Sequence, residues 1–471
     1  MHKKIVFTGD ILQVNFDGSP KMSMETHWLA DLLAYQVGLA APEALVEVVS
    51  WDASHSNHPN SAFDGARFFA LNGMKPCVED WARLEVADTI SGAAAEYLAG
   101  FFQNSVVIGN TMSSFMIRQL NQMGIPYLDF ILHPARFLDD IFFGIRTNSP
   151  EMFAVLQANH YPEEAIRLQA SIHRAGLRRP PAAEVVPGSG LFTAQHGIDK
   201  ALVRDGRLCD IEEYREELSA FLNRHPYVYV KPHPYARQTA RIVAFVRALA
   251  GDSRRVRLIR DNVYSLFSND NFSEVCGISS CAVYEAAYFS KPVTFLSKSL
   301  MELCGPGDAL DPKKFVPVYD AFFNPGFWRR LLSSICPVSE CSDIALPQKT
   351  SRLRNNLHVY WGYGFLDWEV PLRSIGIHPP PQSGTATAWE SHQLALLAGE
   401  DGRHQEAADY LAAALVEEET AERWNDWAMA QQAAGHPREA EDGLRMAQAR
   451  HSKNPLSNTL ENSLVSKVLI S

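Results

Sequence analysis

The sequence predicts an α/β protein in which two Rossmann-type domains face each other across a cleft, followed by an α-helical extension at the C-terminus. Three observations lead to this class. Short runs rich in Val, Ile and Phe alternate with longer segments of helical periodicity, which is the pattern of βαβ units and parallel sheets. A Pro- and Gly-rich stretch without periodicity, residues 177–190, divides this alternation into two halves. After the second half, a repeat of small and large apolar residues takes over.

Length, composition and charge narrow the class of protein further. The 471 residues suffice for two or three domains, and 46% hydrophobic with 21% charged residues is ordinary for a soluble globular protein. A net charge of −11 argues against a dedicated nucleic-acid binder. The seven cysteines include no CxxC pair, which predicts a reduced protein without a zinc site. The N-terminus lacks a signal-peptide core and no apolar run reaches membrane-spanning length, so we expect a cytoplasmic protein, with peripheral association at the inner face of the membrane left open.

The first half, residues 1–176, is expected to form an N-terminal Rossmann-like domain. Its first strand ends at Gly9 and Asp10, and the helix that follows carries Trp28 and Leu29 on an apolar face. The predicted strands are 4–8, 44–49, 105–109 and 126–132, and the predicted helices are 24–37, 81–102, 112–123 and 151–174.

The second half, residues 191–375, is expected to form a C-terminal Rossmann-like domain. Asp210 is placed to cap a helix that runs to about residue 224, with Glu213 completing a capping box. The predicted strands are 191–194, 227–230, 256–259, 274–278 and 292–296, and the further predicted helices are 236–250 and 281–289. A single large doubly wound sheet is the competing layout.

The tail carries an internal repeat over residues 386–455. Gly402, Ala407, Leu411 and Ala414 recur thirty-three residues later, as Gly435, Ala440, Leu444 and Ala447. Glycine at the turn and alanine between close helices are typical of tetratricopeptide-like helix pairs. Two repeats are fewer than such stacks usually need, so we expect them to lean on the body of the protein, on a protein partner or on another subunit.

Two short motifs are predicted to lie at the ligand-binding edge of the second sheet. Residues 227–230 form a continuous β-branched and aromatic run, and the prolines of the following KPHP sequence stop this strand and fix His233 in a stiff loop. Ser279 and Ser280 follow a second short strand and open an apolar helix. Because a helix N-terminus binds anions, an imidazole and two hydroxyls here could cradle a phosphate. The plainer alternatives are a rigid turn and an ordinary N-cap.

Three stretches carry a resemblance to a known family, over roughly residues 190–300. They are Gln195-His-Gly-Ile-Asp199, then Lys231-Pro-His-Pro234, then Ser279-Ser280 followed by Glu285 and by Lys291-Pro-Val293. With them the chain resembles the bacterial capsule and lipopolysaccharide glycosyltransferases that use CMP-activated sugars, and among these the retaining β-Kdo transferases. The resemblance implies a GT-B-like architecture with donor binding in the second domain and acceptor binding in the first. The partners it implies are a nucleotide-sugar donor, as a substrate rather than a cofactor, and a glycan or glycolipid acceptor.

The resemblance also assigns roles around the leaving group. His233 would pair with the departing phosphate, and Ser279 and Ser280 would hold the same phosphate. Glu285 would lie near the ribose hydroxyls, although a solvent-facing helical glutamate is the equal alternative. Lys231 would contact the phosphate or would simply flank the strand end.

The most pointed implication concerns Asp199, with Gln195 beside it in the same donor-binding segment. By resemblance Asp199 would be the nucleophile of a retaining, double-displacement transfer. An N-cap or loop aspartate is the alternative.

Candidate groups in the first domain follow the strand over 126–132. Asp129 could deprotonate the acceptor hydroxyl, and Arg136 could bind the carboxylate of an acidic sugar bidentately. Gly9, at the end of the first strand, could let a ligand approach the backbone closely. The alternative for the polar cluster is a turn followed by a solvated helix.

Missing motifs and rival functions complete the sequence-based interpretation. No DxD pair, no GxGxxG after the first strand and no GxSxG elbow are present, so we expect neither a metal-dependent mechanism nor a dinucleotide cofactor. A sialyl-type or pyruvyl transferase on the same fold is one alternative function. A tetratricopeptide-based assembly protein with a non-catalytic body is another.

Overall fold

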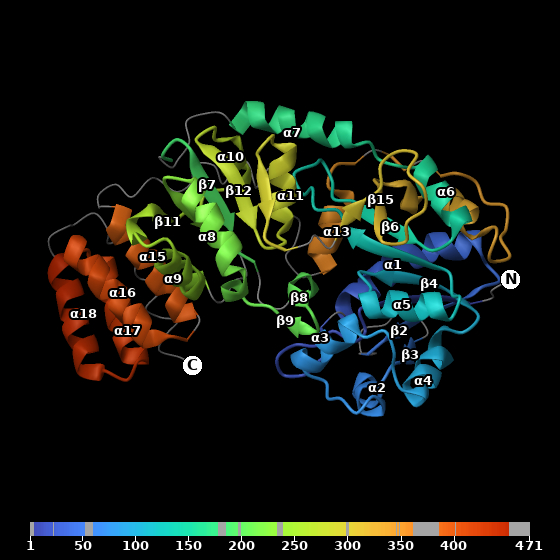
Figure 1. The fold of residues 1–471 in the computed structure, drawn as a ribbon, viewed down its shortest axis with the longest axis horizontal. Coiled ribbons are helices and arrows are strands. Elements are labelled where there is room, and N and C mark those ends of the chain that lie inside the picture. The colour runs from blue at the N-terminus through green and yellow to red at the C-terminus, as the bar shows by residue number, and fades with distance from the viewer. Residues whose placement is uncertain are drawn as a thin grey trace.

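Figure 1 shows the computed structural model of the chain as an elongated arrangement of two α/β bodies and a helical end. The structure describes residues 4–21, 23–51, 60–177, 185–195, 199–232, 239–297, 301–344, 346–347, 349–360, 386–400 and 402–451. Parallel β-sheets covered by helices make up both bodies, which confirms the predicted α/β class. The described strands form two separate large sheets, so the alternative of one continuous sheet is wrong.

The first sheet has eight strands in the order β14-β15-β6-β5-β4-β1-β2-β3. The central strands pair in parallel, whereas β6 is antiparallel to both of its neighbours. The strands are β1 (Lys4–Gly9), β2 (Leu45–Ser50), β3 (Asn60–Ala62), β4 (Ser105–Asn110), β5 (Tyr127–Leu132), β6 (Phe143–Thr147), β14 (Glu302–Leu303) and β15 (Lys314–Val318).

Helices cover both faces of this sheet. Successive residues of β1 point to opposite faces, so Ile5 and Phe7 join one buried cluster while Val6 joins the other. The helices are α1 (Ser23–Ala40), α2 (Gly65–Leu71), α3 (Val78–Val86), α4 (Gly92–Phe102), α5 (Ser114–Gln122), α6 (Pro150–Ala158), η4 (Ala321–Phe323), α12 (Pro325–Leu332) and α13 (Arg352–Tyr360). The helix predicted over 81–102 is two helices, because Ser91 starts a new one by accepting the Ala94 N–H.

The second sheet has five parallel strands in the order β11-β10-β7-β12-β13. They are β7 (Ser189–Thr193), β10 (Val228–Lys231), β11 (Val256–Leu258), β12 (Phe272–Gly277) and β13 (Val293–Phe295), and a hairpin of β8 (Val203–Arg204) and β9 (Arg207–Leu208) lies against α3. The helices around them are α7 (Glu163–Leu177), η1 (Lys200–Leu202), η2 (Ile211–Tyr214), α8 (Arg215–Arg224), α9 (Thr239–Leu249), η3 (Ser253–Arg255), α10 (Val263–Ser268) and α11 (Cys281–Tyr288). The predicted capping box of Asp210 and Glu213 is present.

The chain exchanges elements between the two bodies, so the domain boundaries differ from those expected at residues 176 and 375. Helix α7 precedes the linker but packs on α10 and α11 of the second body, as the green helix at the top of Figure 1 shows. Strands β14 and β15 follow the second sheet but extend the first one. In each case the apolar side chains of the exchanged element complete a core that lies on the other side of the linker.

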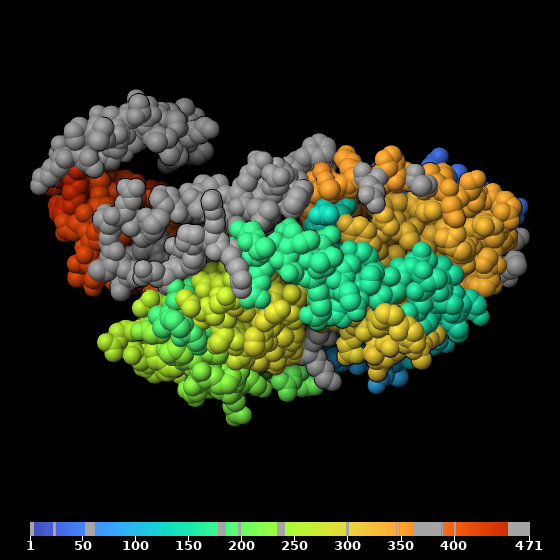
Figure 2. Space-filling model, turned by 90° about the horizontal axis from the view of Figure 1, so that it is seen from above, coloured from blue at the N-terminus to red at the C-terminus, as the bar shows by residue number. Residues whose placement is uncertain are grey.

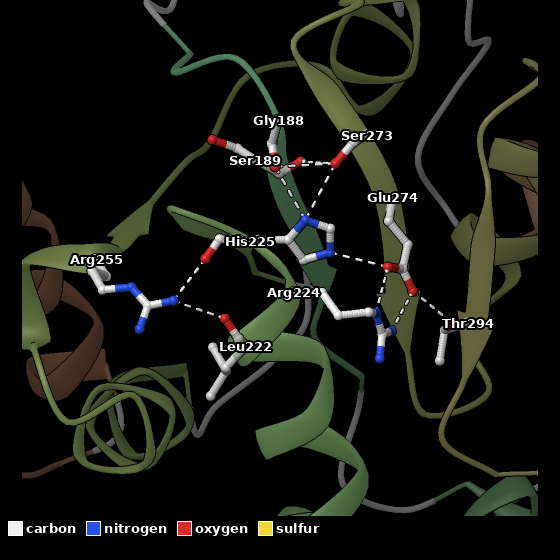
Figure 3. A network of polar contacts seen from close by, with 9 residues as sticks. All are labelled: Gly188, Ser189, Leu222, Arg224, His225, Arg255, Ser273, Glu274 and Thr294. Carbon is white, nitrogen blue, oxygen red and sulfur yellow. Dashed lines mark hydrogen bonds and ion pairs between the residues drawn. The ribbon is translucent and has the colours of Figure 1, made fainter.

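A polar network ties together the amino-terminal edge of the second sheet (Figure 3). Glu274 on β12 accepts from Arg224 at 2.6 Å and from Thr294 at 2.6 Å, and it lies 3.0 Å from His225 Nε2. Burial raises the pKa of Glu274, but the hydrogen bonds from Arg224, Thr294 and His225 outweigh it, so the net pKa is lowered. The imidazole also packs on the backbone of Gly190, where a Cβ would come within 2.7 Å of His225 Cδ2. The polar side chains of this edge are thus bonded to one another, at the end of the sheet away from the predicted ligand site.

The described residues of the tail form four helices: α15 (Ala386–Glu400), α16 (His404–Glu417), α17 (Ala421–Ala433) and α18 (Pro437–His451). Gly402 and Gly435 make the turns that the repeat predicts, with φ of +74° and +87°. Ala407, Leu411 and Ala414 of the first copy are buried, but Leu444 of the second copy is 45% exposed, because α18 is the outermost described helix and packs mainly on α17.

The tail is part of the second body rather than a separate module. Helix α15 lies against α9, where Arg247 and Glu390 form an ion pair at 2.9 Å. Leu394 and Leu411 belong to the same buried cluster as the strands β10 and β11. The helices therefore lean on the body of the protein, one of the three supports expected for two repeats. In Figure 2 the red-orange atoms of the tail lie at one end of the molecule, next to the yellow-green atoms of this body.

We predict that Leu394→Ala destabilises the tail and the second body together. Leu394 is fully buried between them, and such truncations cost about 2–5 kcal/mol. The matched control is Leu396→Ala on the same helix, whose side chain is 39% exposed and whose truncation should have a small effect. Thermal unfolding followed by circular dichroism measures both. A tail that melts alone, with the rest of the unfolding curve unchanged, would contradict a shared core.

Candidate active site

The carboxyl ends of β7 and β12 lie side by side, because Thr193 pairs with Gly277. A Cβ at Gly277 would come within 2.6 Å of Thr193 Oγ1 and 2.8 Å of Val283 Cγ2. Only glycine therefore allows α11 to begin this close to β7. The segments that leave the two strands, with Gln195 on one and Ser279 on the other, start from adjacent points of the sheet edge.

Gln195 joins these two segments through its side-chain amide. Its Oε1 accepts from the backbone N–H and from the hydroxyl of Ser279, each at 3.0 Å. Its Nε2 donates to Asp199 Oδ2 at 3.3 Å. The orientation of the amide follows from these partners, since an N–H needs an acceptor and a carboxylate needs a donor. The structure thus brings together three of the residues that the sequence singled out.

Asp199 begins the short helix η1. Its Oδ1 accepts the Ala201 N–H at 3.0 Å, so the N-cap alternative describes its local geometry. The residue is half-buried, and each of its carboxylate oxygens accepts one N–H. This arrangement fixes the direction of the carboxylate; a nucleophilic role for it remains a prediction.

Ser280 is the N-cap of α11, and its Oγ accepts the Ala282 N–H at 3.3 Å. A hydroxyl that accepts one bond can still donate another, so Ser280 retains a proton for a ligand. The positive end of the α11 dipole opens at the same sheet edge as Gln195 and Asp199. The residues present therefore fit an anion at this position.

Lys231 ends β10, directly beside Thr193 of β7. Burial and the charge of Arg260 lower the pKa of the Lys231 ammonium to about 8, against the raising effect of Asp261. Its cation is therefore held at the predicted ligand edge at neutral pH. His233 lies outside the described residues, so its predicted place beside Ser279 and Asp199 remains a prediction.

Glu285 was expected either near the ribose hydroxyls or in solvent, and the structure places it in neither position. Its side chain is buried and faces neither solvent nor the sheet edge, because Oε1 accepts the Arg136 N–H at 2.6 Å and the Tyr264 hydroxyl at 3.0 Å. Burial raises the pKa of Glu285 to about 7, against the lowering effect of these two donors and of the nearby guanidinium groups. Glu285 thus joins α11 to a loop of the first body.

The loop that Glu285 holds, residues 133–142, contains Arg136. Arg354 on α13 donates to three carbonyls of this loop, those of Arg136, Leu138 and Asp139. Asp140 accepts the backbone N–H groups of Leu353 and Arg354 in return. The backbone of Arg136 is therefore fixed from both sides, while its half-buried side chain lies beside α11.

Asp129 does not have the geometry expected of a base. It is fully buried on β5, where Oδ2 pairs with Arg146 at 2.8 Å and Oδ1 accepts the Met112 N–H at 2.8 Å. Both oxygens are thus occupied within the first body, and Asp129 orients the turn at Thr111 and Met112. That turn has a further partner: Lys200 donates to the carbonyls of both residues, at 2.9 and 3.1 Å.

The end of β1 also differs from the expectation. A Cβ at Gly9 would come within 2.3 Å of Thr26 Oγ1, so this glycine is required by packing against α1 rather than by a ligand. The next residue, Asp10, is 2% exposed, and its Oδ2 has no hydrogen-bond partner within the described residues.

Sequence reasoning missed Lys200, although it follows Asp199 directly. A lysine in a loop is usually a solvated side chain, and nothing local in the sequence distinguishes this one. Its two bonds to the turn of the first body bring the carboxyl edges of the two sheets together at η1. In the sequence, its position directly after Asp199 is what could have indicated a role for Lys200.

Neither a metal cluster nor a membrane-spanning helix occurs in the part of the chain that the structure describes. No group of three His, Cys, Asp or Glu side chains there could hold a metal ion. Each helix among the described residues is too short or too polar to cross a lipid bilayer.

Comparison with known proteins gives distant structural neighbours. No protein-family model and no curated protein matches the chain. Among solved structures, it is similar to the β Kdo 2,7 transferase of Thermosulfurimonas dismutans KpsC, at 14% identity and a TM-score of 0.27, over 52% of this chain and 81% of that one. The β Kdo 2,4 transferase of the same KpsC matches at 13% identity and a TM-score of 0.25, over 48% and 78%. The function proposed below therefore rests on the residues of the site.

We predict that the Glu285 carboxyl makes stability fall as pH rises. A buried carboxyl whose pKa is raised from 4.5 to about 7 contributes its full stability below pH 4.5 and loses it as the pH approaches 7. The loss amounts to about 3 kcal/mol. Glu285→Gln keeps the acceptor for Arg136 and Tyr264 without this loss, so the variant should gain stability relative to the wild type between pH 5 and pH 8.

Urea unfolding at pH 5 and pH 8 measures this difference. The control is Glu340→Gln, a glutamate whose side chain is 93% exposed and which should show no such pH dependence. Equal pH dependence of the wild type and of Glu285→Gln would show that the buried carboxyl is ionised throughout.

Proposed function

We propose that this chain is a glycosyltransferase of bacterial surface-polysaccharide synthesis, which transfers an acidic sugar, Kdo, from CMP-Kdo to a glycan or glycolipid acceptor. The single observation that carries the proposal is the Gln195 amide, which links the Ser279 hydroxyl and backbone to the Asp199 carboxylate. The segment that opens α11, which suits an anion, and the fixed Asp199 carboxylate are therefore bridged by the single side chain of Gln195. A retaining transfer from a phosphate-activated sugar requires these two groups next to each other.

The leaving group would be held at the start of α11. The cytidylate phosphate would accept from the free N–H groups of the first turn and from the Ser280 hydroxyl, with the Lys231 cation at the neighbouring strand end. By the resemblance, His233 would face the same phosphate. These groups offset the negative charge that grows on the phosphate as it departs. One phosphate with these donors needs no metal ion in the proposed mechanism.

Asp199 would act as the nucleophile. In the first displacement a carboxylate oxygen forms a bond to the anomeric carbon and the bond to the phosphate breaks, which leaves a glycosyl ester on Asp199. In the second, the acceptor oxygen forms its bond to the same carbon and the ester bond breaks, which restores the carboxylate. Gln195 and the Ala201 N–H direct the carboxylate for both steps.

The first body would supply the acceptor side. Lys200 fixes η1, and therefore Asp199, against the turn at Thr111 and Met112. The guanidinium of Arg136, on a loop held by Glu285, could bind the sugar carboxylate beside α11. We assign no proton transfer to Asp129, since it is fully buried on β5 in an ion pair with Arg146 within the first body.

The GT-B arrangement and the tetratricopeptide-like tail are part of the same proposal. Two sheets whose carboxyl edges meet at η1 suit a GT-B arrangement, and four helices with glycine turns suit a tetratricopeptide-like tail. A protein partner for that tail, a cytoplasmic location and association with the inner face of the membrane are proposed with it.

Donor profiling tests the proposal. The purified chain is incubated with CMP-Kdo, CMP-sialic acid and UDP-sugars, and release of the nucleotide is followed by chromatography. We expect release from CMP-Kdo only, faster when a Kdo-accepting glycolipid is added. Release from CMP-sialic acid alone would favour the sialyl-type alternative, and release from UDP-sugars alone would remove the donor assignment.

We predict that Asp199→Asn abolishes transfer while CMP binding persists, because the amide has nearly the same shape but is not a nucleophile, and it can keep only one of the two N–H bonds that the carboxylate accepts. The loss of turnover should be on the order of 10⁴-fold. The matched control, Asp205→Asn, changes an aspartate in the β8–β9 turn whose side chain is 82% exposed and should leave transfer intact. Intact-protein mass spectrometry of the wild type with donor alone should detect the glycosyl adduct, and full activity of Asp199→Asn would place the nucleophile elsewhere.

A further inference from the structure

Asp10 is a buried carboxyl with an unused oxygen at the ligand edge of the first sheet. It follows β1, the strand next to β4 at the centre of that sheet. Its Oδ1 accepts the Leu12 N–H at 3.3 Å, and its Oδ2 has no hydrogen-bond partner among the described residues. A buried polar atom without a partner costs about 1–3 kcal/mol, so such an atom needs an explanation.

Two other buried groups beside Asp10 also have an unused polar atom. Glu85 on α3 accepts the Ser114 N–H through Oε1 at 2.8 Å, while its Oε2 has no partner in the described part of the chain. The indole N–H of Trp81, one turn earlier on α3, lies close enough to Asp10 to lower its pKa as a donor, although its geometry falls short of a full hydrogen bond. The three side chains are between 1% and 7% exposed. They form a buried polar cluster that lacks full hydrogen-bond partners among the described residues, which suits a ligand hydroxyl.

This polar cluster lies where the second body meets the first. Lys200 reaches across to the carbonyls of Thr111 and Met112, which follow β4 directly. Gly9 of β1 pairs with Asn110 of β4, so Asp10 leaves the sheet next to the same turn. Lys200 in turn follows Asp199 in the chain. Asp10 and Asp199 therefore approach the junction from opposite bodies, with Lys200 between them.

We propose that Asp10 is the residue that takes the proton of the acceptor hydroxyl in the transfer reaction, with Glu85 and Lys200 as positioning residues that set its charge. This proposal rests on the function proposed above. In the second displacement the acceptor O–H bond breaks and its proton goes to Asp10 Oδ2. The acceptor oxygen bonds to the anomeric carbon, and the ester bond to Asp199 breaks, which returns the electron pair to that carboxylate. Later release of the proton to water restores Asp10.

The charges around Asp10 fit this role. Burial and the like charge of Glu85 raise the pKa of Asp10 to about 7, against the lowering effects of Lys200, the Leu12 N–H and the Trp81 indole. Lys21 is the other cation that senses the Asp10 charge. A base works best when its pKa lies near the working pH. Asp129 cannot share the role, because Arg146 and Met112 occupy its oxygens.

The test is the pH profile of kcat/KM for the acceptor, measured with the full chain. In the wild type the rate should fall as the pH drops below about 7, because a protonated Asp10 cannot accept the proton. Glu85→Gln removes the like charge and should move this fall to lower pH by about 1 unit. Lys200→Met removes the cation and should move it to higher pH. A residue that only supports the fold would not shift the profile in opposite directions.

Asp10→Asn should lower transfer by about 10²–10⁴-fold while CMP binding and formation of the Asp199 adduct persist. Asp88→Asn, which changes an 88% exposed carboxylate in the same body, is the matched control. Thermal unfolding of each variant shows whether it is folded. If Asp10→Asn does not fold, the Glu85→Gln profile decides.

Transfer that is undiminished in Asp10→Asn, or profiles that coincide in the wild type, Glu85→Gln and Lys200→Met, would overturn the proposal. Failure of the proposed function has a different signature, since the wild type would then form no adduct and release no CMP at any pH.

Discussion

The arrangement of the two bodies depends on one buried carboxyl, that of Glu285. It extends from α11, the helix that begins at the proposed phosphate site, and accepts the N–H of Arg136 at 2.6 Å in the loop of the first body. The same loop is fixed from its other side by Arg354. The start of α11 and the side chain of Arg136 are therefore placed relative to each other by backbone contacts. Because the carboxyl is buried with a pKa near 7, this joint is least strained when Glu285 carries a proton.

The local elements could be predicted from the sequence, and the long-range pairings could not. Every parallel strand of the second sheet was predicted, because each is a short apolar run bounded by turn residues. Strand β15 was missed, since Pro317 argues against a strand and its partner β6 lies far away in the sequence. Helical periodicity predicted α7 but not that it packs on the second body. The pattern identifies the apolar face of a helix and does not identify the element against which that face packs.

The same distinction explains the site. Ser279 was singled out by its motif at a strand end and Gln195 and Asp199 by the resemblance, and the structure brings the three side chains together at one edge of a parallel sheet. Asp129 and Glu285 were misjudged, because a single carboxylate in an apolar strand or helix looks the same in the sequence whether its partner is a ligand, a guanidinium or a backbone N–H. Only the fold shows that Arg146 and Arg136 take these places. Lys200 has no motif at all, and its role follows from two carbonyls about ninety residues earlier in the chain.

Hydrogen bonding separates the two carboxyl groups that the proposed mechanism uses. Each oxygen of Asp199 accepts an N–H, so its direction is fixed and its negative charge is supported by donors, as a nucleophile requires. Among the described residues Asp10 has one hydrogen bond, from the Leu12 N–H, and its enclosed Oδ2 has no full partner, so burial raises its pKa and a proton is readily taken up. The two groups come from different bodies. Lys200 follows Asp199 in the chain and lowers the pKa of Asp10. The contact of Lys200 with the turn of the first body therefore links the proposed nucleophile to the proposed base.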